Sequence, residues 1–118
     1  MNNQSILIVD DDPAILVTVA AILEFEGYQV EQARNGAEAL VVLEQGRPGL
    51  VLLDMRMPVL DGWGFARALT ERGIHLPILV MTAAQDAGRW AREIGAAGYV
   101  AKPFELAGLL RAVEGLLA

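Results

Sequence analysis

Five short apolar runs, separated by segments with helix signals, constrain the fold of this chain more than any other feature of its sequence. The first, third and fourth runs are continuous and aliphatic, which is typical of strands covered on both faces of a parallel sheet. The second run alternates with polar residues, which predicts a strand nearer the edge of the sheet. The five predicted strands span residues 6–9, 28–30, 50–53, 78–81 and 99–101.

Each predicted strand is followed by a segment with the signals of a helix. Asp12 and Pro13 supply an N-cap and a favourable first helical residue, and Gly27 marks the end of that helix. The other helices are predicted at residues 37–45, 64–72, 86–94 and 104–117. A strand followed by a helix, five times over, predicts an α/β fold with a parallel sheet and right-handed crossovers. We expect residues 1–118 to form one domain, with no output domain in this chain.

The composition excludes several classes of function. The 118 residues contain no Cys and one His, which excludes zinc–thiolate sites, disulfide frameworks, cysteine nucleophiles and multi-histidine metal sites built from one chain. The formal net charge of -6 argues against nucleic acid as the main partner, because binding to the phosphate backbone needs clustered Lys and Arg. The longest apolar stretch, residues 14–23, is too short to span a membrane, and the first five residues carry no positive side chain. We therefore expect a cytoplasmic protein that has no secretory leader and does not contact the membrane.

Polar residues follow four of the predicted strands at the point where each strand ends. They are Asp10, Asp11 and Asp12 after the first, Asp54 after the third, Thr82 after the fourth and Lys102, the only lysine, after the fifth. Because the carboxyl ends of parallel strands lie at one edge of the sheet, we expect these side chains to gather there. Carboxylates about 5 Å apart repel by roughly 3 kcal/mol per pair at an effective dielectric constant of about 20, so the cluster needs a proton or a cation. Oxygen ligands favour Mg²⁺ over zinc, and a carboxylate beside Mg²⁺, a lysine and a hydroxyl is arranged for phosphoryl transfer.

Five segments, in this order and at this spacing, resemble the CheY-like receiver domain of two-component response regulators. They are ILIVDDDP at residues 6–13, LLDMRMP at 52–58, Asp61-Gly62, VMTA at 80–83 and YVAKPF at 99–104. One segment alone would be weak support, but all of them together, most at a strand end, are strong support. The resemblance covers nearly the whole chain and implies a doubly wound (βα)5 fold, flavodoxin-like, with the strand order 2-1-3-4-5.

The resemblance implies a role for each residue of the acidic cluster. Asp54 is the implied phosphoacceptor, and Lys102 is the implied partner of the phosphoryl group. Asp10, Asp11 and Asp54 are the implied protein ligands of Mg²⁺, together with the backbone carbonyl of Arg56. Mn²⁺ or Ca²⁺ could substitute for Mg²⁺ at such a site.

Other residues are implied to sense or to cradle the phosphoryl group. Thr82 matches the switch hydroxyl of the family, and Tyr99 matches the aromatic residue whose rotamer changes with it. The backbone N–H groups of Met55 and Ala83 would complete the phosphoryl cradle. The bond between Lys102 and Pro103 matches one that is cis in the family.

The implied activity is that of a phosphorylation-controlled signalling domain. Such a domain accepts a phosphoryl group from a phosphohistidine and switches the surface formed by the fourth helix, the fifth strand and the fifth helix. The implied partner is a sensor histidine kinase or a histidine phosphotransferase, docked on the first helix through Val17 and Ala21. The switched surface would serve a homodimer or an output partner. The protein would catalyse its own phosphorylation and dephosphorylation without turning over an external substrate.

Apolar residues cover nearly all sides of the first predicted helix. We predict a core face of Ile15, Val19, Ile22 and Leu23, which leaves Leu16, Val17, Ala20 and Ala21 on other sides. An apolar patch beside an acidic pocket is typical of a surface that binds a partner, with self-association as the alternative.

Two residues carry information beyond the family pattern. Arg56 brings a guanidinium close to Asp54, where it either attracts the phosphodonor or alters the access of water to the acyl phosphate. Trp90 either fills the core or belongs to the switched surface near Tyr99, and we take the second interpretation as the hypothesis.

Three polar residues are interpreted as structural. Asp12 is expected to cap the first helix, and Asp61 is expected to form a turn with Gly62. His75, in a loop before a predicted strand, is interpreted as a surface residue and not as a phosphohistidine.

Three other classes of protein compete with this interpretation. A phosphatase of the haloacid dehalogenase type would use Asp10 and Asp12, but Pro13 follows where such enzymes have another residue, and no cap domain is present. An FMN-binding protein would need a phosphate-binding loop after the first strand, where three aspartates would repel phosphate. A degenerate receiver used only for docking would not need the full acidic, Thr and Lys set. Whether the chain is a stand-alone regulator or the receiver of a longer protein stays open, as do the kinase, the stimulus and the output.

Overall fold

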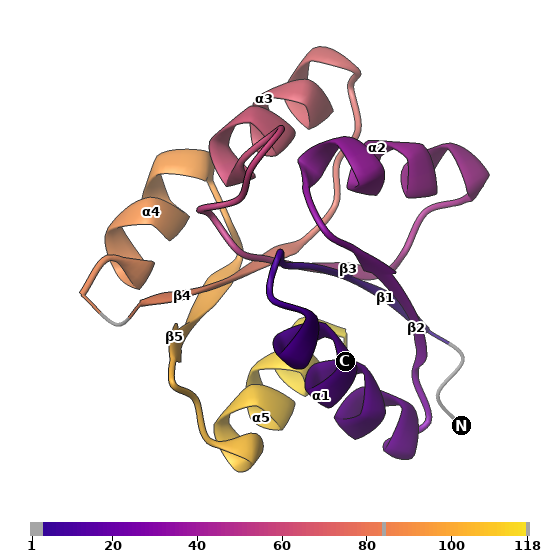
Figure 1. Cartoon of the computed structure of the whole chain (residues 1–118), viewed down its shortest axis with the longest axis vertical. Coiled ribbons are helices and arrows are strands. Elements are labelled where there is room, and N and C mark those ends of the chain that lie inside the picture. The colour runs from indigo at the N-terminus through magenta and orange to yellow at the C-terminus, as the bar shows by residue number, and fades with distance from the viewer. Residues whose placement is uncertain (1–3, 84, 118) are drawn as a thin grey trace.

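The computed structural model describes residues 4–83 and 85–117, and within these residues five strands alternate with five helices (Figure 1). The strands are β1 (Ser5–Val9), β2 (Gln29–Ala33), β3 (Leu50–Leu53), β4 (Ile78–Ala83) and β5 (Gly98–Lys102). The helices are α1 (Pro13–Phe25), α2 (Gly36–Gln45), α3 (Gly62–Glu71), α4 (Ala87–Ile94) and α5 (Leu106–Leu117). The predicted elements are confirmed, with boundaries that differ by a few residues. Residues 1–3, which belong to the stretch used for the expectation of no leader, lie outside the described residues.

The strands form one parallel sheet in the order β2-β1-β3-β4-β5, which confirms the predicted fold class and strand order. The alternating second run is an edge strand, as predicted, but β2 begins one residue later than expected and continues to Ala33. Glu31 and Gln32 are exposed within it, because an edge strand has one side open to water. Strand β1 lies between β2 and β3, so the chain runs from β1 to one neighbour and then crosses over to the other. The carboxyl ends of β1 and β3 therefore meet at the topological switch point, where ligands bind in such folds.

Helices cover both faces of the sheet (Figure 1). Helices α1 and α5 lie on one face, over an aliphatic cluster that includes Ile8, Leu23 and Leu109. Helices α2, α3 and α4 lie on the other face, over a second cluster that includes Phe65 and Trp90. Within residues 4–83 and 85–117, no helix has both the length and the apolar character that crossing a membrane requires.

The predicted core face of α1 is partly wrong. The buried residues are Leu16, Val19, Ala20 and Leu23, whereas Ile15 and Ile22 are only partly buried. The buried set has the spacing i, i+3, i+4, i+7, which forms one stripe along a helix. The predicted set lay about one residue out of phase, because a helix with apolar residues on most sides gives little directional signal. Val17 and Ala21, the predicted contacts of a partner, are both exposed, Val17 to 65%, and Phe25 on the same helix is 89% exposed.

The hypothesis that Trp90 belongs to an exposed surface is wrong. Trp90 is 5% exposed, and its ring packs edge-on against Trp63 of α3 with 4.9 Å between the ring centroids. The side chain therefore points from α4 into the cluster shared with α3. It does not lie on the α4-β5-α5 surface.

Side chains fix the starts of three helices. Asp12 accepts a hydrogen bond from the N–H of Ala14 at 2.9 Å, so its predicted capping role at α1 is confirmed. Asp61 likewise caps α3 by accepting from the N–H of Gly64 at 2.8 Å. Asn35 caps α2 through the N–H of Glu38. Each cap satisfies a backbone donor that the first helical turn leaves without a partner.

Candidate functional site

Two buried aspartates stand side by side at the switch point of the sheet. β1 and β3 are neighbours with Val9 opposite Leu53, so the next residues, Asp10 and Asp54, follow on adjacent strands. The N–H of Asp54 donates to the carbonyl of Val9 at 2.9 Å, which extends the ladder one step beyond the strands. Asp10 is fully buried and Asp54 is 7% exposed. The prediction that these residues gather at the carboxyl end of the sheet is confirmed.

Lys102 brings a positive charge to this pair from two strands away. Its Nζ lies 2.7 Å from Asp10 Oδ2 and 3.7 Å from Asp54 Oδ2. Because β4 separates β5 from β3, only a long side chain can reach the pair from β5. The Lys102–Pro103 peptide bond is cis, as the resemblance implied.

The pocket makes the Asp54 carboxyl less acidic than usual. Burial of the side chain and the charge of Asp10 raise the pKa of Asp54 from its ordinary 3.8 to about 6. The Lys102 ammonium and a hydrogen bond from the N–H of Met55 to Asp54 Oδ1, at 2.9 Å, act in the opposite direction. Asp11 adds a smaller effect that raises the pKa further. The Asp54 carboxylate is therefore more basic than usual, and its ionisation lowers the stability of the folded state.

Three carboxylates meet closely enough to share a cation. One oxygen from each of Asp10, Asp11 and Asp54 lies within 4.8 Å of the others, and Asp11 is exposed at the mouth of the cluster. The donors are all oxygen, which suits a hard divalent ion such as Mg²⁺. Asp10 Oδ1 also accepts the N–H of Asp12 at 2.9 Å, which orients the carboxylate toward the cluster. The residues present therefore fit a magnesium site. The carboxylate of Asp12 caps α1 instead.

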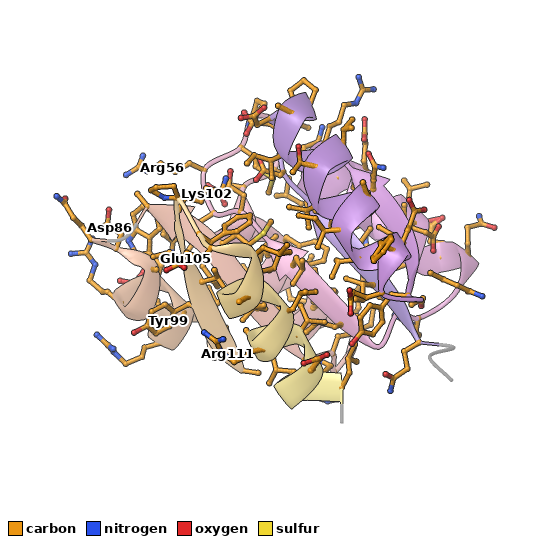
Figure 2. The ribbon with its side chains drawn as sticks, turned by 90° about the horizontal axis from the view of Figure 1, so that it is seen from below. Arg56, Asp86, Tyr99, Lys102, Glu105 and Arg111 are labelled. Carbon is orange, nitrogen blue, oxygen red and sulfur yellow. The ribbon has the colours of Figure 1, made fainter. Side chains whose placement is uncertain are left out.

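The predicted switch residues occupy neighbouring strands with different exposure. Thr82, near the end of β4, is 4% exposed, whereas Tyr99 on β5 is 54% exposed. A methyl group placed on Gly88 of α4 would lie 3.4 Å from the Tyr99 ring, so the ring rests against α4. Figure 2 shows Tyr99 and Lys102 on the same strand, with Tyr99 toward its start. Ala83, predicted to offer its N–H to a phosphoryl group, is the last residue of β4 and is exposed.

The loop from β3 to α3 holds features that sequence reasoning missed. Val59 has a positive φ of 70°, a conformation that a β-branched residue seldom adopts. Gly62 has no room for a side chain, because a methyl group there would lie 2.5 Å from Met55 Sδ and 2.8 Å from Met55 Cα. The Asp61-Gly62 pair signalled a turn, but nothing in the sequence showed the close approach to Met55.

Arg56, on the same loop, does not point at a carboxylate. Its guanidinium carbon lies 5.1 Å from the centre of the Trp90 ring, and the residue is exposed. Figure 2 shows Arg56 at the end of the molecule where Lys102 lies.

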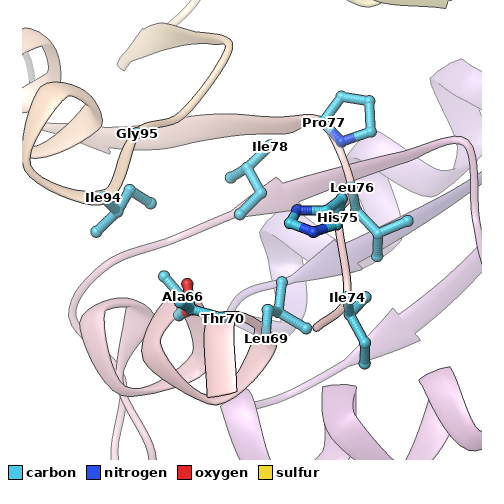
Figure 3. Close-up of a pocket in the computed structure, with 10 residues that line it drawn as sticks. All are labelled: Ala66, Leu69, Thr70, Ile74, His75, Leu76, Pro77, Ile78, Ile94 and Gly95. Atoms are coloured by element: carbon cyan, nitrogen blue, oxygen red, sulfur yellow. The ribbon is translucent and has the colours of Figure 1, made fainter. Parts of the chain in front are cut away.

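A cavity of about 370 Å³ lies at the opposite end of the sheet, between the ends of α3 and α4 (Figure 3). Its lining includes Leu69, Ile78 and Ile94, and among the lining residues there is no carboxylate. His75 lies on its wall and is exposed, which confirms the interpretation of this histidine as a surface residue.

The amino-acid sequence matches a known protein family. Residues 6–114 match the response regulator receiver domain family. The chain is 43% identical over 114 residues to the response regulator MprA of Mycobacterium sp. (strain KMS), a match that covers 95% of this chain and 50% of that protein. A response regulator MprA of Mycobacterium avium is 42% identical over the same length. The chain thus spans about half the length of the curated relatives it matches.

The fold is also similar to solved structures of response regulators and receiver domains. The receiver domain of a signal transduction histidine kinase from Syntrophus aciditrophicus is 36% identical, with a TM-score of 0.84 over 97% of this chain and 89% of that chain. The chemotaxis response regulator CheY4 of Vibrio cholerae is 31% identical, with a TM-score of 0.87 over 97% of this chain and 98% of that chain. Together with the carboxylate cluster at the switch point, these likenesses show that the chain belongs to the response regulator receiver domain family of two-component systems.

Proposed function

We propose that Asp54 accepts a phosphoryl group from the phosphohistidine of a sensor histidine kinase or a histidine phosphotransferase. The observation that carries this proposal is the placement of a buried, weakly acidic Asp54 beside Asp10, Asp11 and Lys102 at the switch point. We treat residues 1–118 as one receiver domain that acts in the cytoplasm.

The chemistry of the transfer is a displacement at phosphorus. An ionised oxygen of Asp54 attacks, the bond between phosphorus and the histidine nitrogen breaks, and the electron pair stays on the imidazole, which takes up a proton. The pKa of about 6 leaves most of the Asp54 carboxyl ionised at neutral pH. The hydrogen bond from Met55 N–H orients the carboxylate for the attack.

Asp10, Asp11 and Asp54 would hold Mg²⁺, with the backbone carbonyl of Arg56 as a further ligand. The ion, when bound, would neutralise negative charge on the carboxylates and on the transferring phosphoryl group. Mn²⁺ or Ca²⁺ could take its place at an all-oxygen site.

Lys102 and Thr82 would bind the new phosphoryl group. Lys102 lies near both carboxylates and is closer to Asp10. A dianionic phosphoryl group on Asp54 would carry more negative charge than the Asp10 carboxylate and would therefore attract the ammonium more strongly. The Thr82 hydroxyl and the N–H groups of Met55 and Ala83 would supply further donors. The movement of Thr82 would leave room for the ring of Tyr99, which is now exposed and rests against α4. An inward turn of this ring would shift the α4-β5-α5 surface between two states. That surface would bind a second copy or an output partner.

The donor would dock on α1. Val17 and Ala21 are exposed on this helix, and a groove of about 490 Å³ runs between α1 and the segment after β5, lined by Ile15, Lys102 and Phe104 among others. The groove leads from the apolar helix to the lysine of the site. A partner helix seated there would bring its phosphohistidine toward Asp54. Replacing Val17 by Glu should slow transfer from the cognate kinase, while Val41→Glu, on exposed α2, should not.

The central test is phosphorylation by a small donor. Acetyl phosphate with Mg²⁺ should add one phosphoryl group to the protein, as measured by mass spectrometry, and EDTA should prevent it. The adduct should be absent from Asp54→Asn and present in Asp12→Asn, because Asp12 only caps α1. An intact wild-type protein that gains no adduct would overturn the proposal. Steady turnover of a small phosphomonoester would instead revive the phosphatase alternative.

A further inference from the structure

An aromatic cluster joins the loop after the phosphoacceptor to α4. Trp63 of α3 and Trp90 of α4 pack edge to face with 4.9 Å between ring centroids. The indole N–H of Trp63 donates to Glu93 of α4 at 2.9 Å, which ties the two helices together. The Arg56 guanidinium lies over the Trp90 ring at 5.1 Å. The side chain of Arg56 thus links the loop that follows Asp54 to α4.

The charge of Arg56 is not neutralised by a carboxylate. Within residues 4–83 and 85–117, no Asp or Glu oxygen lies within 4.0 Å of its guanidinium. Its contact is a cation–π interaction at an exposed position, which is a weak attraction. A second guanidinium, that of Arg89, lies 6.0 Å from the same ring, but it is already ion-paired with Asp86 at 2.7 Å. Of the two, Arg56 is the one that a new anion could recruit.

The covalent distance to the phosphoacceptor is short. Arg56 is two residues beyond Asp54, and two residues of extended chain span at most about 7 Å. A phosphoryl group on Asp54 would place a dianion at the end of the molecule where Arg56 and Lys102 lie (Figure 2). Guanidinium–phosphate hydrogen bonds are stronger than an exposed cation–π contact and favour two parallel bonds.

We propose that Arg56 is a charge-sensitive latch, held on Trp90 before phosphorylation and drawn from Trp90 to the phosphoryl group afterwards. The proposal rests on the proposed function of Asp54 and adds a second connection from the site to α4. Trp63, whose indole N–H is bonded to Glu93, also packs edge to face on Trp90, so the loss of Arg56 removes one of two contacts of the ring. This connection does not pass through Thr82 or Tyr99, and it reaches α4 from the side that faces α3.

Tryptophan fluorescence can test the latch, because Trp90 can be observed alone in a Trp63→Phe background. Phosphorylation of this parent with acetyl phosphate and Mg²⁺ should change the Trp90 emission. The additional substitution Arg56→Gln should abolish most of that change while the mass of the phosphoryl adduct is still observed. Arg56→Lys should restore part of it. The matched control is Arg34→Gln, which removes an exposed guanidinium that pairs with Glu38 and does not approach Trp90.

Each outcome is decisive. An equal emission change in the parent and in Arg56→Gln, both phosphorylated, would overturn the latch and leave the role of Asp54 intact. A phosphorylated parent with no change at Trp90 would do the same. A folded parent with no adduct would overturn both proposals. If Trp63→Phe does not fold, the wild-type chain labelled with fluorotryptophan gives two fluorine resonances, and only one of them should depend on Arg56 after phosphorylation.

Discussion

At the amino end of the sheet, neutral hydrogen bonds join segments that are far apart in the chain. The N–H of Gly49, before β3, donates to the carbonyl of Ser5 at 2.8 Å. The side-chain amide of Gln4 donates to the carbonyl of Leu117 at 3.0 Å, which ties the end of α5 to the start of β1. The carboxyl end of the same strands is built from charged groups instead. There Asp10 and Asp54 are buried beside Lys102.

The difference shows where this fold gives up stability. The amino end fixes the frame with contacts that do not depend on pH or ions. The carboxyl end holds an aspartate with a raised pKa and, in the adjoining loop, Val59 with a positive φ, and both features disfavour the folded state. A cation bound among these carboxylates can then act as a strong effector, because it relieves a cost that the fold already carries.

The largest test of this contrast is Asp54→Asn. Because the folded-state pKa of about 6 is above the ordinary 3.8, ionised Asp54 destabilises the fold as pH rises through that range, and the penalty is complete above it. Without metal, the variant should gain about 3 kcal/mol in the free energy of unfolding at about pH 8 and roughly half of that at about pH 5. Urea unfolding at both pH values measures the difference.

The control for this experiment is Glu44→Gln, on the exposed surface of α2. Its effect should stay within about 0.5 kcal/mol at both pH values. Saturating Mg²⁺ should narrow the gap between wild type and Asp54→Asn, because the ion binds the charged pocket more tightly. A gain that does not depend on pH would show that the carboxyl end is not the costly end.

The second test is Gly62→Ala, in the loop beneath the site. The added methyl group would meet Met55 Sδ and Cα inside the contact distance, and backbone atoms cannot move aside cheaply. We expect a loss of about 2 kcal/mol in unfolding free energy, by the usual cost of overpacking. We also expect slower phosphorylation by acetyl phosphate, since Met55 N–H orients Asp54. Wild-type behaviour in both measurements would show that the loop tolerates displacement.

The third test is Val59→Asn. Val59 is 82% exposed, so little packing is lost, and asparagine adopts a positive φ more easily than valine. We expect a gain of about 1 kcal/mol. Val41→Asn, at an exposed helical position of α2, is the matched control and should not gain stability. A similar gain in both variants would mean that backbone strain at Val59 is not its source.

The smallest effect is expected at the amino end, where Gly115 lies in the last turns of α5. In the part of the chain that the structure describes, a methyl group added there would meet no atom outside its own turn of the helix, so Gly115→Ala should gain about 0.5 kcal/mol through helix propensity alone. Gly95→Ala also meets no neighbour, but its φ of 69° should make that change unfavourable. Thermal unfolding of the two variants compares them directly. A loss for Gly115→Ala would reveal a constraint on α5 that the structure does not show.

The sequence predicted the scaffold and the placement of the cluster well, for a physical reason. A continuous run such as residues 50–53 has to be buried on both faces, and the polar residue that ends it is then forced to the edge of the sheet. Asp54 and Lys102 could be placed in this way without knowing their contacts. The burial of these strands on both faces of the sheet therefore explains most of what the sequence could predict about the fold and the site.

Side-chain direction could not be predicted in the same way. The apolar residues of α1 lie on most of its sides, so the choice of Ile15 and Ile22 over Leu16 and Ala20 for the core was out of phase. Trp90 was misplaced because one bulky residue in a short helix does not show which neighbour it packs against. The backbone of Val59 depends on the path of a whole loop and leaves no mark in its own residue type.

The position of Lys102 makes the site chemically addressable. It is the only lysine of the 118 residues, and its side chain is a quarter exposed while its ammonium is paired with Asp10. An amine-selective reagent therefore has one side-chain target in the chain, and that target lies in the pocket itself. The rate at which this amine is labelled would report whether the pocket is occupied, because a ligand there changes which group pairs with the ammonium. The measurement needs no fluorophore and no substitution in the chain.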